Sequence, residues 1–197
     1  MMKMKKMIIG VAMLLFANVG FGQISDNAVI PVSVTLNSIL RLTVVSGGNI
    51  QFVVNTIDDY TTGIANSPRY TTKFNVASSR DFNVLLYSES AAFYGMNYES
   101  TGGSGNQMPL NNVGYLIDNV GGATGGVVSV GTVAGLSTAT AAVLSAVKAG
   151  SSTVNTFDIK WELGTVANTS MNGQTLLQQS LTSDTYVTNV FINVVPI

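Results

Sequence analysis

Phe157-Asp158-Ile159-Lys160-Trp161-Glu162-Leu163 is the stretch that decides the fold. Its apolar residues alternate with charged ones. Because successive side chains of an extended strand point to opposite faces, one face of the strand is apolar and the other is charged and exposed to solvent. A strand of this kind packs one face on a core and exposes the other, which is typical of antiparallel sheets. We therefore predict that Trp161 is a core residue.

The same two-residue period recurs on both sides of this strand. Short β-branched or aromatic runs occupy residues 39–45, 50–54, 70–76, 82–86 and 113–117. The turn-forming residues 46–49 favour a hairpin between the first two runs, and residues 78–81 form a tight polar turn between the next pair. The last run, 185–195, is apolar on both faces, so we expect it to be central or covered. Many short strands at turn-marked intervals predict an all-β protein, an immunoglobulin-like antiparallel β-sandwich.

Residues 121–150 differ in composition from the rest of the chain, since they are almost wholly Gly, Ala, Val, Ser and Thr. We interpret them as an insertion within a single β-sandwich domain that spans residues 38–197. The second half predicts one short helix at about 136–149, with Ser137 or Thr138 near its start, Lys148 in its last turn and Gly150 as its stop. Residues 127–133 fit a strand equally well. Residues 58–63 are predicted to be a polar loop.

The first 22 residues have the pattern of a secretory signal peptide. Three lysines at positions 3, 5 and 6 precede an apolar run at 7–21, and small residues lead up to Gln23. We expect this signal to be removed and the protein to be secreted. The apolar run is shorter than the ~20 residues that cross a bilayer, and no later stretch is long and apolar enough, so the protein is not expected to span a membrane.

Residues 23–37 are predicted to form an N-terminal strand directly after the signal. Pro31, Ser33 and Thr35 fall on one side of the extended chain. The other side is wholly apolar and consists of Ala28, Ile30, Val32, Val34 and Leu36. Such a strand completes either its own sheet or a neighbour's sheet. We interpret it as a candidate donor strand, with these five side chains as the subunit contact.

Composition excludes several classes of function. The chain has no His and no Cys, which removes Ser-His-Asp and Cys-His catalysis, the usual zinc and iron sites, and disulfides. Without the three signal lysines, six basic residues face ten acidic ones, a net charge of −4, which argues against nucleic-acid binding. Charged residues make up only 10% of the chain, against about 25% in ordinary soluble domains. We predict no enzyme activity, no cofactor and no metal site.

Three local features have a functional and a plain interpretation. Tyr94 and Tyr98, beside Phe93, could form an aromatic platform for surface glycans, although core packing or a subunit contact is favoured. Glu89 and Glu99 flank this stretch and could act as a carboxylate pair in a hydrolase, but solvated loop carboxylates explain them as well. Residues 58 and 59 could contribute calcium ligands, but their spacing matches no EF-hand loop and a turn is favoured.

Two stretches resemble a known group of proteins. Residues 31–44, then Ile50-Gln51-Phe52, Asp59-Tyr60, Gly63 and residues 72–86, resemble exported pilin-like β-sandwich domains of Bacteroidetes. Residues 183–194 are similar to the final strand of spore-coat-U-type and fimbrial domains, where a turn and a Tyr precede an alternating strand. The chain lacks the cysteines of many spore-coat-U-type domains and the cysteine of lipoprotein pilins, and residues 121–150 lie outside the match.

The resemblance implies an immunoglobulin-like fold and assembly into fibres on the surface of a Gram-negative bacterium, by lending a strand to the next subunit. With the composition, it leads us to expect a structural subunit of an extracellular filament that is a homopolymer. The alternative is a monomeric secreted adhesive or carbohydrate-binding module.

Overall fold

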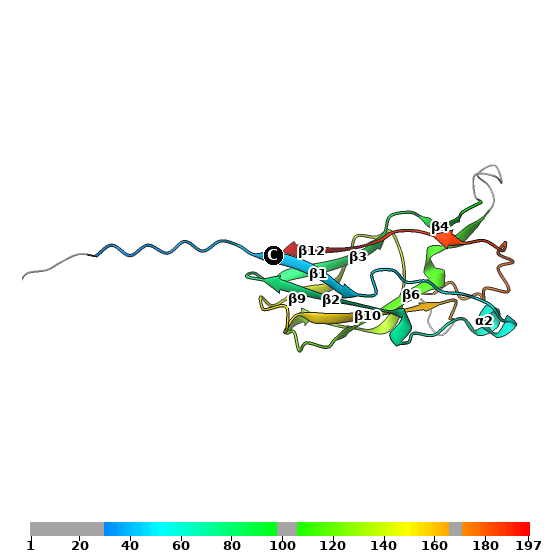
Figure 1. The fold of residues 1–197 in the computed structure, drawn as a ribbon, viewed down its shortest axis with the longest axis horizontal. Coiled ribbons are helices and arrows are strands. Elements are labelled where there is room, and N and C mark those ends of the chain that lie inside the picture. The colour runs from blue at the N-terminus through cyan, green and yellow to red at the C-terminus, as the bar shows by residue number, and fades with distance from the viewer. Residues whose placement is uncertain (1–29, 98–105, 166–170) are drawn as a thin grey trace, which may run out of the picture. The chain divides into compact units, whose positions relative to one another are not determined.

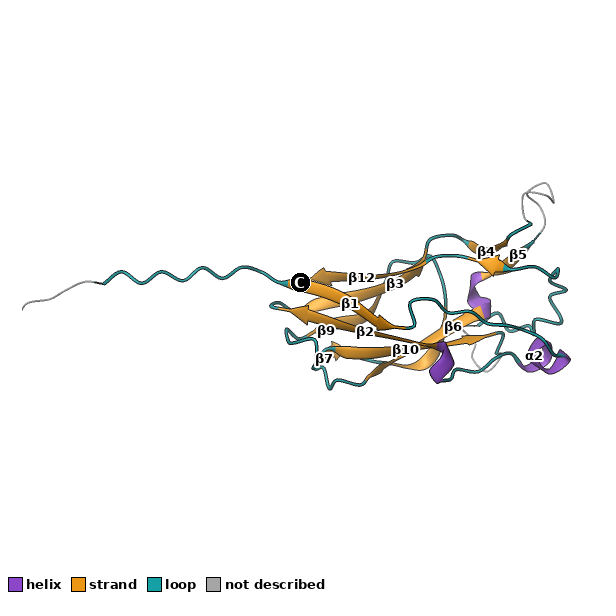
Figure 2. Ribbon diagram, viewed as in Figure 1, coloured by secondary structure: helices purple, strands orange, loops and turns teal. Residues whose placement is uncertain are grey.

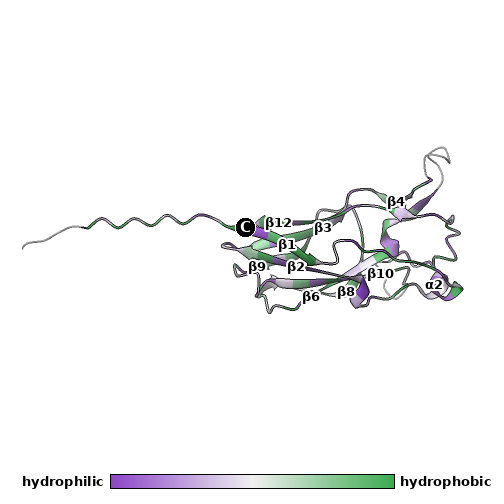
Figure 3. Ribbon diagram, in the orientation of Figure 1, coloured by the Kyte–Doolittle hydropathy of each residue, from purple (hydrophilic) through white to green (hydrophobic). Residues whose placement is uncertain are grey.

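The computed structural model describes residues 30–97, 106–165 and 171–197. The chain divides into two units, of which the first contributes residues 30–36 to this description and the second is Asn37–Ile197. Residues 30–36 belong to no β-ladder, and hydrophobic and hydrophilic residues alternate along them (Figure 3). The predicted signal peptide and Ala28 lie outside the described residues.

The second unit is an all-β sandwich whose ladders are all antiparallel (Figure 1). The larger sheet has the order β1-β2-β10-β6-β8, with bounds Leu40–Ser46, Thr71–Ser78, Thr156–Leu163, Val113–Asn119 and Val130–Gly135. The second sheet has the order β12-β3-β9-β7, with bounds Val190–Pro196, Phe82–Ser88, Ala142–Val147 and Gly125–Val127. A small third sheet has the order β11-β4-β5, with bounds Tyr186–Val187, Ala92–Gly95 and Gln107–Pro109.

The core joins the inward faces of the two large sheets. Figure 2 shows β12 and β3 in one layer and β2 and β10 in another. Phe74 of β2 and Phe157 of β10 stack with ring centroids 5.3 Å apart, and both are fully buried. They share one cluster with Phe82 and Val84 of β3 and Leu144 of β9. The alternation of β2 and β3 is therefore realised as predicted, with every second side chain in the core. In β10 it holds as far as Trp161, because Glu162, predicted on the solvent-exposed face, is buried.

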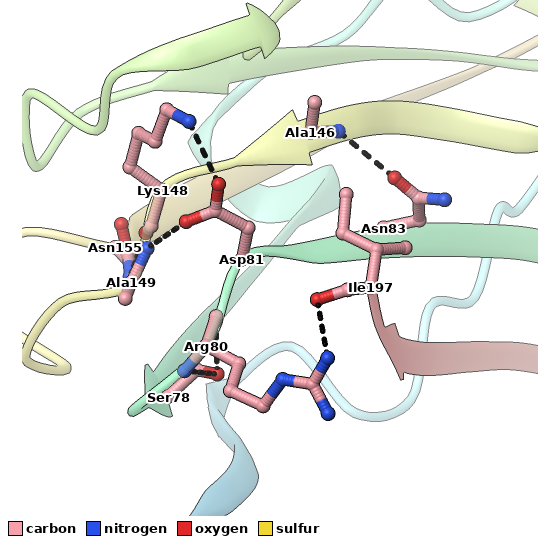
Figure 4. Close-up of polar contacts among 9 residues, drawn as sticks. All are labelled: Ser78, Arg80, Asp81, Asn83, Ala146, Lys148, Ala149, Asn155 and Ile197. Carbon is pink, nitrogen blue, oxygen red and sulfur yellow. Dashed lines mark hydrogen bonds and ion pairs between the residues drawn. The ribbon is translucent and has the colours of Figure 1, made fainter.

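The turn between β2 and β3 carries the chain from one sheet to the other. Asp81 follows it and accepts hydrogen bonds from the Lys148 ammonium at 2.7 Å and from the Ala149 N–H at 3.0 Å (Figure 4). The C-terminal residue Ile197 donates its N–H to the Asp81 carbonyl at 2.8 Å and accepts from Arg80 at 3.2 Å. The C-terminal end of the chain is thus held at this turn.

The predicted helix at 136–149 is wrong. Residues 142–147 form β9, which pairs with both β3 and β7. Leu144 and Val147 are fully buried there. Pairing on both edges and burial of these two side chains outweigh the weak helix preference of the Ala-rich sequence. Strand formation before it, in β7 and β8, agrees with the alternative interpretation of residues 127–133.

Two further local predictions are wrong. The stretch at 58–63 is not a plain loop, because α2 (Ile57–Thr62) begins there on a capping box in which Thr56 and Asp59 bond reciprocally. The hairpin at 46–49 does not form, because β1 pairs with β2 and residues 50–54 belong to no strand. Two short 3₁₀ helices, Pro68–Tyr70 and Leu110–Asn112, complete the described helices. No helix within the described ranges is long and apolar enough to span a membrane.

Candidate functional site

Two strands, β1 and β12, lie at the ends of their sheets. β1 pairs with β2, and β12 pairs with β3. Among residues 30–97, 106–165 and 171–197, neither strand has a second partner. The prediction that the last strand is central or covered is therefore wrong, since β12 is an edge strand. An edge strand that is apolar on both faces is unusual, because exposed apolar edges promote pairing with another chain.

The core-facing side chains of β12 are incompletely covered. Val190, Ile192 and Val194 lie opposite residues of β3 that are buried, so they point into the sandwich. They are nevertheless only partly buried. On the opposite face of the same strand, Phe191 is 43% exposed and packs against Tyr87 with ring centroids 5.5 Å apart.

β1, in the other sheet, also has core-facing side chains that are incompletely covered. Leu42 lies opposite Val76 and Val44 lies opposite Phe74, and both partners are fully buried, so Leu42 and Val44 also face the core. Val44 is still 46% exposed. A core-facing valine this exposed indicates that the strand lacks a neighbour on its outer side.

The backbone groups of both strands alternate between their paired and open edges. The residues that flank β12 bond to those that flank β3, since the Asn189 carbonyl accepts from the Glu89 N–H and the Ile197 N–H donates to the Asp81 carbonyl. The same register gives the odd-numbered residues of β12 their bonds to β3. The N–H and C=O groups of Val190, Ile192 and Val194 therefore face the open edge. In β1, the bonds of Ile39 run to Ser79, so Leu40 and Leu42 face the open edge in the same way.

A groove of about 500 Å³ lies between these edges. Leu42 and Val44 form one wall, and Val190 and Ile192 form the other. Its remaining lining is mostly apolar and includes Phe93, Val113, Leu136 and Trp161. Trp161 is 6% exposed and confirms the prediction of a core tryptophan.

A second groove of about 570 Å³ continues the first along the sandwich. The two share five lining residues, which are Asn49, Ile50, Phe52, Phe93 and Val113. Ile50, Phe52 and Val54 alternate as partly buried residues beside the core, although their segment belongs to no ladder. The two grooves are thus adjacent, and residues from the 42–54 and 181–192 regions of the chain line them.

Asp184 lines the second groove and is held in place by hydrogen bonds. Its carboxylate accepts bonds from Asn106 Nδ2 at 2.5 Å, the Asn97 N–H at 3.1 Å and the Thr185 N–H at 2.7 Å. Desolvation opposes ionisation, but these hydrogen bonds outweigh it and hold the pKa of Asp184 below its usual value. Nearby, desolvation and then the charge of Asp184 raise the pKa of Tyr186, whose hydroxyl donates to the Thr182 carbonyl at 2.7 Å.

The predicted contact residues of the N-terminal strand are described from Ile30 onward. Ile30 is 80%, Val32 83%, Val34 78% and Leu36 90% exposed. Four apolar side chains on one face of an extended segment therefore have almost no apolar cover. Such a surface is costly in water and is typical of a segment that is buried on binding.

The remaining predicted sites do not gather into one arrangement within the described chain. Tyr94 is half-buried in β4, while Tyr98 and Glu99 lie outside the described residues. Glu89 accepts a 2.6 Å hydrogen bond from Asn189 Nδ2. Asp59 closes the cap of α2, and the hydrogen bond from the Asn55 N–H, followed by those from Thr56, lowers its pKa.

The sequence predictions missed the groove and named only the apolar N-terminal segment that ends at Leu36. The walls of the groove come from strands 150 residues apart in sequence, so only the pairing pattern brings them together. One usable signal was the two-faced apolar strand at the C-terminus, which has no covering partner. Comparison of the sequence with protein-family models and with curated proteins finds no match.

Proposed function

We propose that this protein is a structural subunit of an extracellular filament, in which residues 28–36 of one copy insert between β1 and β12 of a neighbour. One observation carries the proposal: two strand edges in different sheets leave core-facing apolar side chains exposed around a single groove. A strand added there would pair with both edges and cover these side chains.

The N-terminal segment has the pattern that such a groove requires. Its inward face would consist of Ala28, Ile30, Val32, Val34 and Leu36, and its outward face of polar residues and Pro31. Nine residues extend about 30 Å at ~3.3 Å per residue. Burial of the five side chains would contribute about 8–12 kcal/mol before the cost of ordering the segment.

Strand donation of this kind produces open-ended chains. The donor and the acceptor are different surfaces of the same protein, so each copy still offers one of them after binding, and the contact is head-to-tail. The low charge of the chain, with 10% charged residues, also suits subunits that pack closely against one another.

Electron microscopy of the native and the purified protein tests this function. Filaments are expected from both sources, and uniformly monomeric particles from native cell surfaces would contradict the proposal. Val34→Asp places a charge on the inward face of the segment and should abolish filaments. Thr35→Asp is the matched control, since the same charge lies one residue away on the outward face and should leave filaments intact.

A further inference from the structure

We infer that the outer face of the four-stranded sheet β12-β3-β9-β7, the face that points away from the core, packs against the same face of a second copy. The proposed strand insertion would cover the inward side chains of β12 and its open edge, and it leaves this outer face uncovered. The inference therefore concerns a different surface, and it holds whether or not the protein forms filaments.

The outer faces of β12 and β3 are largely apolar. Phe191 of β12 lies opposite Tyr87 of β3 with ring centroids 5.5 Å apart, and Leu85 is next on the same side of β3. These side chains point away from the core, because the residues that alternate with them along β3 are buried. Phe191 is 43% and Val195, on the same side of β12, 40% exposed. A sheet face that meets water normally carries polar side chains, so this face has the character of a buried one.

The four strands of this sheet carry no charge. None of their residues is Asp, Glu, Lys or Arg. Asp81, which precedes β3, and Lys148, which follows β9, lie beyond the strand ends and pair with one another at 2.7 Å. On the outer face, Asn83 Oδ1 accepts from the Ala146 N–H at 2.8 Å and so already has a partner (Figure 4). An uncharged surface can therefore cover this face without desolvating a charge.

The outer face of the five-stranded sheet is charged and does not suit the uncharged face as a partner. Lys73 lies 3.8 Å from Asp158, and Lys160 lies 2.5 Å from Asp118. Burial of these exposed pairs would remove them from water at a high cost. The four-stranded sheet of a second copy has no such cost. Two identical faces also match in size, and a contact between them is two-fold symmetric.

The size of the face predicts a weak contact for one pair of copies. β12 and β3 have seven residues each, β9 has six and β7 has three. With ~4.8 Å between strands and ~3.3 Å per residue, the face covers roughly 350 Å². This is less than half of the ~800 Å² that each partner buries in a standard interface. Repetition along a filament multiplies weak contacts, so the same face would join two filaments side by side.

Sedimentation equilibrium of the Val34→Asp variant tests the inference in a protein that should form no filaments. We expect a reversible dimer at micromolar to millimolar concentration. Val195→Lys in this background places a charge on the face and should raise the dissociation constant of the dimer at least tenfold. Val45→Lys is the matched control, because Val45 is 53% exposed on the outer face of the charged sheet. It should leave the dissociation constant unchanged.

Thiol cross-linking gives a second measurement that adds no charge to the face. The natural chain has no Cys, so Leu85→Cys in the Val34→Asp background supplies a single thiol in the middle of β3. A bismaleimide that spans about 10 Å, the usual distance between packed sheets, is expected to join two copies. Val45→Cys is the matched control and should give no cross-link above that of random collision.

Electron microscopy reads the same contact in the parent protein. Parent filaments should lie side by side, filaments with Val195→Lys should be single, and filaments with Val45→Lys should lie side by side like the parent. This measurement rests on the proposed function, whereas the dimer of the Val34→Asp variant does not.

The outcomes separate this inference from the proposed function. A Val34→Asp variant that stays monomeric at millimolar concentration, or equal effects of Val195→Lys and Val45→Lys, overturns the inference and leaves the filament function standing. Dissociation of the dimer by an excess of the peptide 28–36 also overturns it, because the segment would then be what covers the face. If the parent forms no filaments but the variant dimerises, the proposed function is lost and the inference stands. If Val195→Lys does not fold, the cross-link at Leu85→Cys decides.

Discussion

The indole Nε1 of Trp161 donates a hydrogen bond of 2.9 Å to Thr72 Oγ1, within the sandwich. The Thr72 hydroxyl donates in turn to the carbonyl of Gly47 at 2.6 Å. All three residues line the groove, and Gly47 directly follows β1. This chain of two bonds therefore fastens the end of an edge strand to the core, where no neighbouring strand in the described residues holds it on its outer side.

Replacement of Thr72 by Val is expected to lower the free energy of unfolding by about 1–3 kcal/mol, because the indole N–H and the Gly47 carbonyl lose their partner in a buried site. Urea denaturation measures the change. Thr72→Ser keeps the hydroxyl and is the matched control, with a smaller loss. A Val variant as stable as the wild type would show that water satisfies both groups.

Trp161 also provides a direct reading of the groove, because it is the single Trp of the chain. We expect its fluorescence to shift to shorter wavelength, saturably, when a peptide of residues 28–36 is added to a variant with Val32→Asp and Val34→Asp. The reason is that the inserted strand displaces water beside the indole. A peptide that carries the same two substitutions is the control. An unchanged spectrum with the natural peptide in excess would contradict strand insertion.

The positions of the strands could be predicted from the sequence better than the pairs that the strands form. The alternation of residues 157–163 and of 70–86 is imposed by one buried face, so β10, β2 and β3 could be located from period alone. Which strands pair depends on contacts far apart in the chain. The link between β2 and β3, for example, joins two different sheets, and a hairpin of the same length would have a similar pattern.

For the same reason, the N-terminal segment could be identified from the sequence, but the groove could not. The apolar face of residues 28–36 is local and visible in the sequence, whereas the groove needs Leu42 of β1 and Ile192 of β12 to lie across one opening. β9 shows the opposite case, in which the local sequence favours the wrong secondary structure. Its Ala-rich sequence favours a helix locally, but β3 and β7 on either side determine that it is a strand.

We expect acid to destabilise the domain through Asp81, which lies at the turn where β3 begins. The hydrogen bond from Lys148 and then that from the Ala149 N–H hold the pKa of Asp81 below its ordinary value of 3.8. A carboxylate with a lowered pKa in the folded state stabilises the fold above its unfolded pKa, and this contribution is lost as the pH falls through the lowered value. We therefore expect the free energy of unfolding to fall below about pH 4.

Asp81→Asn tests this assignment. The variant should be less stable than the wild type at neutral pH, and the difference should shrink as the pH falls below 3.8. Denaturant unfolding at several pH values measures it. Lys148→Met removes the ammonium while leaving the backbone donor of Ala149, so it should retain part of the pH dependence. A difference between wild type and Asp81→Asn that stays constant with pH would rule out ionisation of Asp81 as its cause.

Two adjacent valines of β1 distinguish the groove from the outer surface. Val44 is 46% and Val45 53% exposed, so they are almost equally accessible, but only Val44 faces the core and lines the groove. Val44→Asp places a carboxylate where an inserted apolar strand would desolvate it, and should reduce strand binding by at least the ~100-fold that corresponds to about 3 kcal/mol. Val45→Asp should bind within a few-fold of the wild type. Peptide titration followed by Trp161 fluorescence gives both affinities. Equal losses of affinity in the two variants would contradict strand binding in the groove. They would show that a charge on either face of β1 has the same effect.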